Sequence, residues 1–186
     1  MIVLHSAGEF TGRESVVALG MFDGVHVGHQ KLIRTAVELA KQMDAQSVVC
    51  TFDRHPLSLL CPDRAPEPLL TLDQNLQKFN QLGADIALVQ SFTKEFASML
   101  PEEYIRSLVN SLRAKAIVIG ENYTFGHKGM GNSRMVQQLA GKYGYRAEVV
   151  QPVMDGEGLI SSTRIRNLIR EGEADRAQML LDIQKI

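Results

Sequence analysis

The sequence has few cysteines, no long apolar run and almost no net charge, and each absence narrows the class of protein. Of its 186 residues only two are cysteines, Cys50 and Cys61, which form no Cys-x-x-Cys motif and build no disulfide framework. No apolar stretch approaches the ~20 residues that a membrane-spanning helix needs. The formal net charge is −1, so we expect no nucleic-acid or membrane partner.

The beginning of the chain also lacks the pattern of a targeting signal. No basic region followed by a long apolar one occurs after Met1, which predicts that there is no signal peptide. With the scarce cysteines, this favours a cytoplasmic location. What is present is ordinary for a globular enzyme, with 45% hydrophobic and 22% charged residues. At this length we expect a single domain over residues 1–186.

Strand and helix signals alternate along the chain. Short apolar runs rich in β-branched residues predict strands at 16–22, 47–52, 86–89, 116–119 and 146–150. Apolar residues at helical spacing, or helix-start signals, predict helices at 28–43, 72–82, from Pro101, at 133–143, near Ser162 and near Glu173. This alternation predicts an α/β fold with an open, parallel, Rossmann-like sheet and helices on both faces.

The stretch from Asp53 to Leu70 breaks this pattern. It has no clear period and contains four prolines, Pro56, Pro62, Pro66 and Pro68. Irregular segments of this length in compact domains tend to be lids or binding loops. We therefore expect it to serve the functional site.

The first chemical motif is G-M-F-D-G-V-H-V-G-H, residues 20–29, directly after the first predicted strand. Ligands of open α/β sheets bind outside the carboxyl ends of the strands. Gly20 and Gly24 allow sharp turns and close approach, while His26 and His29 are spaced to face one side of a helix N-terminus. Such a helix end attracts phosphate, and imidazole donors suit a phosphoryl transition state.

Two other interpretations of this motif have to be weighed. A single histidine at a helix start is often only a cap or a surface residue. His-x-x-His is also half of a zinc site, but zinc needs a third or fourth ligand. His55 and the two cysteines follow no recognisable ligand spacing, so we assign no metal ligands.

A second motif, I-S-S-T-R-I-R, occupies residues 160–166. The three hydroxyl residues at 161–163 are N-cap residues ahead of a predicted helix, and their hydroxyls and amides are suited to phosphate. Arg164 and Arg166 add cations, and arginine matches phosphate with paired donors. The alternative is a capped helix with solvated arginines.

A third motif, I-G-E-N-Y-T-F-G-H-K-G-M-G-N, covers residues 119–132 after the fourth predicted strand. Its four glycines and two aromatic residues favour a loop that approaches a planar ligand closely. It matches neither the Walker pattern nor the G-x-G-x-x-G dinucleotide fingerprint. Lys128 is either a phosphate ligand or simply solvated.

Together these motifs resemble one family, the FAD synthetase (FMN adenylyltransferase) module of the bacterial bifunctional riboflavin kinase/FAD synthetases. Residues 20–29 resemble the family's G-x-F-D-G-V-H-x-G-H, and residues 160–166 match its I-S-S-T-x-I-R. T-F-D-R-H-P at 51–56 is similar to T-F-D-P-H-P, and residues 69–75 and 120–126 also follow family segments. The resemblance runs from about residue 16 to residue 181.

The resemblance implies attack by the FMN phosphate on the α-phosphorus of ATP, with Mg²⁺ as cofactor and with ATP and FMN as small-molecule partners. The catalytic residues it implies are His26, His29 and Arg166. The ATP-binding residues it implies are Gly20, Phe22, Asp23, Gly24, Ser162, Thr163 and Arg166. Residues implied to position flavin or ATP are Phe52, Asp53, His55, Asn122, Tyr123 and Phe125.

Two alternatives remain open at this point. One is a related nucleotidylyltransferase that acts on another phosphorylated acceptor, and the other is a non-catalytic regulator that binds flavin or nucleotide. Members of the resembled family usually continue into a riboflavin kinase domain, whereas this sequence stops at Ile186. We therefore expect FMN adenylation without riboflavin phosphorylation.

Overall fold

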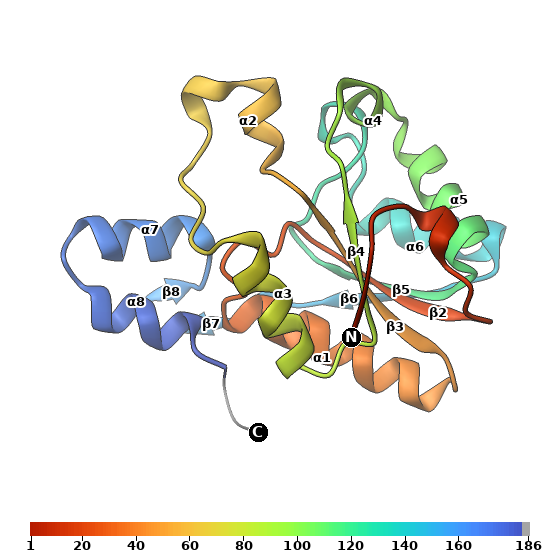
Figure 1. The fold of residues 1–186 in the computed structure, drawn as a ribbon, viewed down its shortest axis with the longest axis horizontal. Helices are drawn as coiled ribbons and strands as arrows, with labels where there is room; N and C mark the ends of the chain where they lie inside the picture. The colour runs from red at the N-terminus through yellow and green to blue at the C-terminus, as the bar shows by residue number, and fades with distance from the viewer. Residues whose placement is uncertain (184–186) are drawn as a thin grey trace.

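A parallel β-sheet forms the centre of the computed structural model, which describes residues 1–183 (Figure 1). Its order is β1-β4-β3-β2-β5-β6, and every neighbouring pair is parallel. The strands are β1 Ile2–Leu4, β2 Ser15–Leu19, β3 Gln46–Phe52, β4 Ile86–Gln90, β5 Ala114–Gly120 and β6 Arg146–Val150. Strand addition reverses at β2, between β3 and β5, which places a ligand crevice outside the carboxyl ends of these strands.

Helices cover both faces of the sheet, as the sequence predicted. On one face Val16 and Ala18 of β2 pack against α1 (Val27–Gln42) and α3 (Leu72–Gln81). On the other face Val17 and Leu19 pack against α5 (Pro101–Leu112) and α6 (Ser133–Tyr143). Successive strand side chains point to opposite faces, so a strand buried on both sides must be apolar throughout. The predicted α/β class and parallel sheet are thus confirmed.

Local sequence explains where the flanking helices begin and end. Thr71 and Gln74 form a reciprocal capping box at the start of α3. Asn132 caps α6 by accepting a hydrogen bond from the amide of Met135. At its other end α6 stops at Gly144, which has a φ of 72°.

The C-terminal part of the described chain forms a small unit beside the sheet, at the left of Figure 1. A two-stranded antiparallel ribbon, β7 (Met154–Asp155) and β8 (Gly158–Leu159), precedes α7 (Ser162–Arg170) and α8 (Ala174–Leu181). These helices enclose their own apolar cluster of Ile165, Leu168, Ala177 and Leu181.

One buried glutamine joins this unit to the sheet. The Gln30 amide donates to the carbonyl oxygens of Val25 at 3.0 Å and Asp182 at 2.8 Å, and lies 3.4 Å from that of Leu181. Lys78 of α3 donates to the Leu181 carbonyl as well. The end of α8 is therefore tied to the helices that cover the sheet.

Several short elements differ from the prediction. The first predicted strand ends at Leu19 rather than at residue 22, because Phe22 has a φ of 52°, which no strand accommodates. The proline-rich segment contains the short helix α2 (Pro56–Leu60) and a 3₁₀ turn, Pro62–Arg64. Besides these two, the elements not predicted are β1, β7, β8, α4 (Lys94–Ser98) and the 3₁₀ turns Ala7–Glu9 and His127–Gly129. All are too short for their periodicity to stand out.

The structure also bears on membrane insertion. Within residues 1–183, no helix combines the length and the apolar character that crossing a bilayer requires.

Candidate active site

The loop between β2 and α1 has a strained backbone. Phe22 and Val25 have φ values of 52° and 47°, a region that bulky and β-branched residues rarely occupy. Both side chains are fully buried, so packing holds the conformation in place. Gly20 and Gly24 meet close neighbours, since a Cβ on Gly20 would lie 2.8 Å from the Phe22 ring. On Gly24 it would lie 2.9 Å from Leu181.

This loop delivers the two motif histidines to the first turn of α1. His26 is the N-cap residue, and its Nδ1 accepts a hydrogen bond from the His29 amide at 3.4 Å. The two imidazole rings are stacked, with centroids 3.7 Å apart and an interplanar angle of 17°. The Phe22 ring packs edge-on against the His29 ring, with the ring centroids 5.4 Å apart, and so helps to hold the pair in place.

Burial sets the protonation state of the histidine pair. It lowers the pKa of His26 to about 4, and burial followed by the proximity of His26 lowers that of His29 well below 6.5. Both rings are therefore neutral at pH 7. Because Nδ1 of His26 accepts a hydrogen bond, its proton lies on Nε2, which makes that nitrogen a donor. A bound phosphate anion would favour protonation of the pair.

The second motif meets the first at the start of α7. Ser161 alone caps this helix, by accepting a hydrogen bond from the amide of Arg164, which corrects the prediction of three capping residues. Ser162 instead donates its hydroxyl to the Asp23 carbonyl at 2.9 Å, and Thr163 is exposed. The starts of α1 and α7 thus both lie beside the 20–26 loop, where their dipoles favour an anion.

Asp23 links the two motifs to the proline-rich segment. One carboxylate oxygen accepts the Leu69 amide at 2.9 Å, and the other pairs with Arg166. Arg166 also donates its Nε to the Glu67 carbonyl at 2.7 Å. The Asp23 and Arg166 side chains are each 13% exposed. Arg166 thus contacts the proline-rich segment through the Glu67 carbonyl. A phosphate bound to Arg166 would compete with this contact and with the Asp23 ion pair.

A largely apolar cavity of about 400 Å³ opens between α2, α4 and the third motif. Five of the six residues implied for flavin or ATP positioning line it: Phe52, His55, Asn122, Tyr123 and Phe125. Burial raises the pKa values of Tyr104 and Tyr123, so both phenols stay protonated. A cavity of this size and character suits a planar aromatic ligand.

Three aromatic residues of this cavity were missed from the sequence. Phe92, Phe96 and Tyr104 join Phe52 and Phe125 in a chain of ring contacts with centroids 5.3–5.9 Å apart. They come from β4 to α5, a stretch with no recognised motif. The signal that would have revealed them is the position of residue 92 just past the carboxyl end of β4, at the ligand-binding edge of the sheet.

A smaller cavity of about 120 Å³ adjoins the aromatic one and has the more polar lining of the two, so it is called the polar cavity. Met21, Phe52 and His55 line both. Asp53, implied to position flavin or ATP, lines the polar cavity and not the aromatic one. The charged and amide residues that line the polar cavity with it are Asp23, Arg54, Asn75 and Arg166. His55 caps α2 through Nδ1, which accepts the Leu57 amide at 3.1 Å, so its Nε2 is a donor between the cavities.

The predicted site residues thus fall into three groups. His26, His29, Asp23, Ser162 and Arg166 lie around the 20–26 loop, and the aromatic residues gather in the neighbouring cavity. Gly20, Phe22 and Gly24 support the loop through close packing. Within residues 1–183, no group of three or more His, Cys, Asp or Glu side chains is arranged to hold a metal ion.

Comparison with known proteins gives a consistent result. The sequence profile of the FAD synthetase family matches residues 10–164. A bifunctional riboflavin kinase/FMN adenylyltransferase from Listeria monocytogenes is 36% identical over 185 residues, covering 97% of this chain and 58% of the relative. Its namesake from Bacillus subtilis is 36% identical over 170 residues, covering 90% and 53%. The chain spans about half the length of these curated relatives.

Two solved structures share the fold. A crystal structure described as a macrolide-efflux protein from Streptococcus pneumoniae aligns with a TM-score of 0.83 and 32% identity, covering 97% of this chain and 60% of that one. A pantoate-β-alanine ligase from Francisella tularensis aligns with a TM-score of 0.56 and 16% identity, covering 100% and 90%. The second likeness concerns the fold alone.

Proposed function

The chain belongs to the FAD synthetase family, and from this premise we propose that it transfers AMP from ATP to FMN, giving FAD and pyrophosphate. The observation that carries the proposal is the adjacency of two kinds of site. The stacked histidines at the start of α1 follow directly on the loop that carries Met21 and Asp23. Asp23 lines the polar cavity, and Met21 lines both that cavity and the aromatic one. A phosphate site beside a pocket for a planar ring suits an enzyme that joins a nucleotide to a flavin phosphate.

The reaction needs little covalent chemistry from the protein. An oxygen of the FMN phosphate forms a bond to the α-phosphorus of ATP, while the bond from that phosphorus to the oxygen bridging to the β-phosphorus breaks. Pyrophosphate leaves with the electron pair, and no proton transfer is required because the flavin phosphate attacks as an anion. Catalysis therefore rests on alignment and on stabilising the charge that develops on the phosphoryl oxygens.

We assign the roles of the phosphate site as follows. His26 and His29 donate hydrogen bonds to the α-phosphoryl oxygens, and the ends of α1 and α7 add their dipoles. Ser162, Thr163 and Arg166 hold the outer phosphates of ATP. Arg166 reaches them by exchanging its contacts with Asp23 and Glu67 for phosphate oxygens.

The flavin ring occupies the aromatic cavity, where Phe52, Tyr123 and Phe125 make stacked or edge-to-face contacts with it. Asn122 and His55 supply polar contacts at its margin. Mg²⁺, if bound together with ATP, would neutralise charge on the phosphates.

The test is a direct assay. Incubation with FMN, ATP and Mg²⁺ followed by chromatography should yield FAD and pyrophosphate in equal amounts. Replacing FMN by other phosphorylated acceptors in the same assay provides the control. Loss of ATP without FAD formation, or a preference for another acceptor, would overturn the proposal.

A further inference from the structure

Within residues 1–183 two buried side-chain atoms lack a hydrogen-bond partner, His29 Nδ1 and Asn75 Oδ1. Buried polar atoms are nearly always paired, so an orphan invites a functional explanation. His29 belongs to the phosphate site. Asn75, in the first turns of α3, lines the polar cavity that adjoins the aromatic one. An unpaired acceptor beside a ligand cavity suits a ligand that brings a donor.

Arg54 lines the same cavity and is only loosely held. Its side chain is 58% exposed, and its Nε lies 3.4 Å from Oδ1 of the adjacent Asp53. That oxygen also accepts the Phe92 amide at 3.1 Å. The terminal nitrogens of Arg54 therefore remain as a pair of donors for a ligand anion. The other arginine of the cavity, Arg166, is already paired with Asp23.

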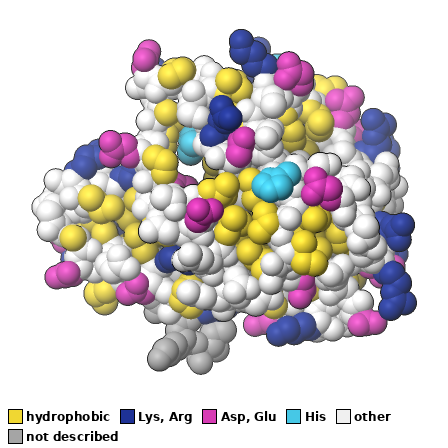
Figure 2. Space-filling model, in the orientation of Figure 1, with side chains coloured by type: hydrophobic (Ala, Val, Ile, Leu, Met, Phe, Trp, Pro, Cys, Tyr) yellow, Lys and Arg dark blue, Asp and Glu magenta, His cyan; other side chains and the backbone are white. Residues whose placement is uncertain are grey.

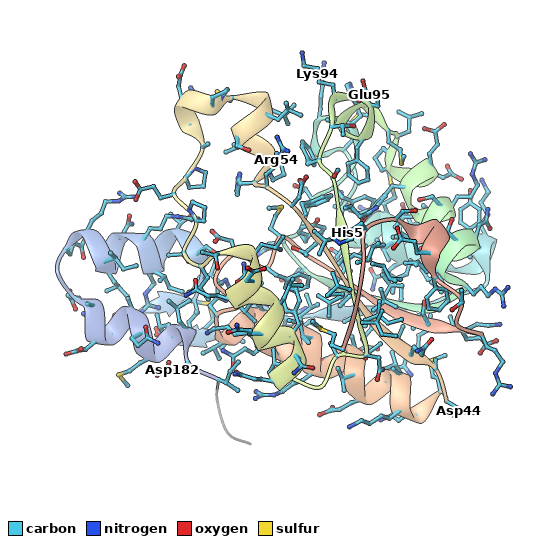
Figure 3. The ribbon with its side chains drawn as sticks, in the orientation of Figure 1. His5, Asp44, Arg54, Lys94, Glu95 and Asp182 are labelled. Atoms are coloured by element: carbon cyan, nitrogen blue, oxygen red, sulfur yellow. The ribbon has the colours of Figure 1, made fainter. Side chains whose placement is uncertain are left out.

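The surface view supports the accessibility of Arg54. Figure 2 shows the molecular surface notched between its two upper projections, and Figure 1 identifies these as α2 and α4. Figure 3, in the same orientation, places the labelled Arg54 on the segment that leads from β3 into α2.

From these observations we propose that the polar cavity binds the phosphorylated polyol tail of the acceptor, with Asn75 and Arg54 as its specificity-determining residues. This inference rests on the proposed function. Asn75 Oδ1 accepts a hydrogen bond from a ribityl hydroxyl, because a carbonyl oxygen attracts a hydroxyl and repels a phosphate. Arg54 pairs with the phosphate. The shared lining residues, Met21, Phe52 and His55, allow the tail to pass from the ring pocket into the polar cavity.

ATP offers the same chemistry, since it also carries hydroxyls and phosphates. The geometry favours the flavin tail, because the polar cavity opens onto the aromatic pocket through three residues that both share. His26, His29 and Ser162 do not line the polar cavity, and Arg166, which does, is already paired with Asp23. The test must therefore compare acceptor and nucleotide separately.

The first variant is Asn75→Leu, with Gln77→Leu on the exposed side of the same helix as its control. Binding of FMN, riboflavin and lumiflavin, which has no tail, is measured by quenching of flavin fluorescence. We expect Asn75→Leu to weaken the binding of FMN and of riboflavin alike by about 5- to 150-fold, because one buried ligand hydroxyl loses its acceptor. The binding of lumiflavin should be unchanged. The Tm of the free protein should stay constant or rise, because an unpaired buried acceptor is removed. Equal loss for lumiflavin, or no loss for FMN, would overturn the role of Asn75.

The second variant is Arg54→Gln, with the exposed Arg64→Gln as its control. We expect on the order of 5-fold weaker FMN binding at low salt, unchanged riboflavin binding, and a difference that fades at high salt. Titration with a non-hydrolysable ATP analogue should give equal affinities for variant and parent. If Arg54→Gln weakened the binding of the ATP analogue rather than the binding of FMN, the cavity would belong to the nucleotide and the proposal would be overturned.

The two proposals fail in distinguishable ways. If the parent protein makes FAD while both variants bind FMN normally, the tail subsite is wrong and the adenylyltransferase function stands. If the parent binds no flavin and makes no FAD, both are wrong.

Discussion

At the scale of single residues, the two histidines are stacked on each other, largely shielded from solvent and neutral at pH 7. His26 uses one nitrogen to cap α1 and keeps the other as a donor, so one side chain both starts the helix and serves the candidate site. His29 is held between this ring and Phe22. Fixed donors need no reorganisation when charge develops on a phosphoryl oxygen, which is the usual origin of large electrostatic effects in enzymes.

Removal of one ring should therefore affect turnover more than folding. We expect His29→Ala to lower kcat for FAD formation by about 10²–10³, the loss typical of one preorganised donor. The far-ultraviolet circular dichroism spectrum should be unchanged. His5→Ala, at an exposed position, is the control (Figure 3). Near-normal kcat in His29→Ala would contradict the role.

The same burial predicts how stability depends on pH. Unfolded His26 takes up a proton near pH 6.5, whereas folded His26 does so only near pH 4. Between these values the unfolded chain holds more protons, so the free energy of unfolding falls as the pH falls from 6.5 to 4. His26 alone should contribute a loss on the order of 2–3 kcal/mol across this range.

Asn at position 26 tests this contribution, because it keeps a capping oxygen and cannot titrate. Urea unfolding of the parent and of His26→Asn should be compared at pH 7.5, 5.5 and 4.5. The variant should lose distinctly less stability over this interval than the parent. Parallel losses in the two proteins would show that other groups govern the acid sensitivity.

At the scale of elements, α7 separates two arginines that look alike in the sequence. Arg164 pairs with Asp155 and Glu157 and holds the β7–β8 ribbon. Arg166, two residues later, points to Asp23 and the proline-rich segment. Positions two apart on a helix face different sides, so the two cations serve different neighbours.

The two arginines should respond differently to the same change. Arg166→Lys should lower kcat/KM by about 10- to 100-fold, because an ammonium group cannot reproduce paired donation to phosphate. Arg164→Lys should leave kcat/KM close to that of the parent and lower Tm slightly. Steady-state kinetics and thermal unfolding of both variants give the answer. Equal kinetic effects would remove Arg166 from the phosphate site.

The elements also show what the sequence could predict. The long periodic helices and the buried strands were predicted within a few residues, because two-sided burial leaves an unmistakable apolar pattern in β2 and β3. The short α2 and the edge strand β1 left no such pattern. The position of residue 92 after a predicted strand was readable from the sequence, but its ring contact with Phe96 and the other aromatic residues was not, because it depends on the order of the strands in the sheet.

At the scale of the whole molecule, the site depends on contacts between distant parts of the chain. Sequence motifs identified the 20–26 loop and α7 separately, and the resemblance implied that they cooperate. The contacts that join them, from Ser162 and Arg166 to Asp23, emerge only from the fold. The support that Gln30 provides was not predicted, because a lone glutamine on a helix carries no signal of its three carbonyl partners.

Gln30→Leu tests this support. The change leaves buried carbonyl oxygens without their donor, which should cost about 1–3 kcal/mol and lower Tm by roughly 2–10 °C for a chain of this size. Hydrogen exchange in residues 174–182 should rise more than in the sheet. Gln42→Leu, at the exposed end of α1, should be nearly neutral. Uniform exchange across the molecule would contradict a local joint.

Because these contacts join residues far apart in the sequence, they bear on how the protein folds while the ribosome makes it. Gln30 meets carbonyl groups 151 and 152 residues later in the chain, and Gly24 packs against Leu181. A ribosome that has released β6 has already supplied every strand of the large sheet, yet the loop bearing the histidines still lacks its neighbours. At about 5–20 residues per second, the rest follows within seconds. A nascent chain halted after Val150 would thus contain every strand of the parallel sheet and only part of the proposed phosphate site.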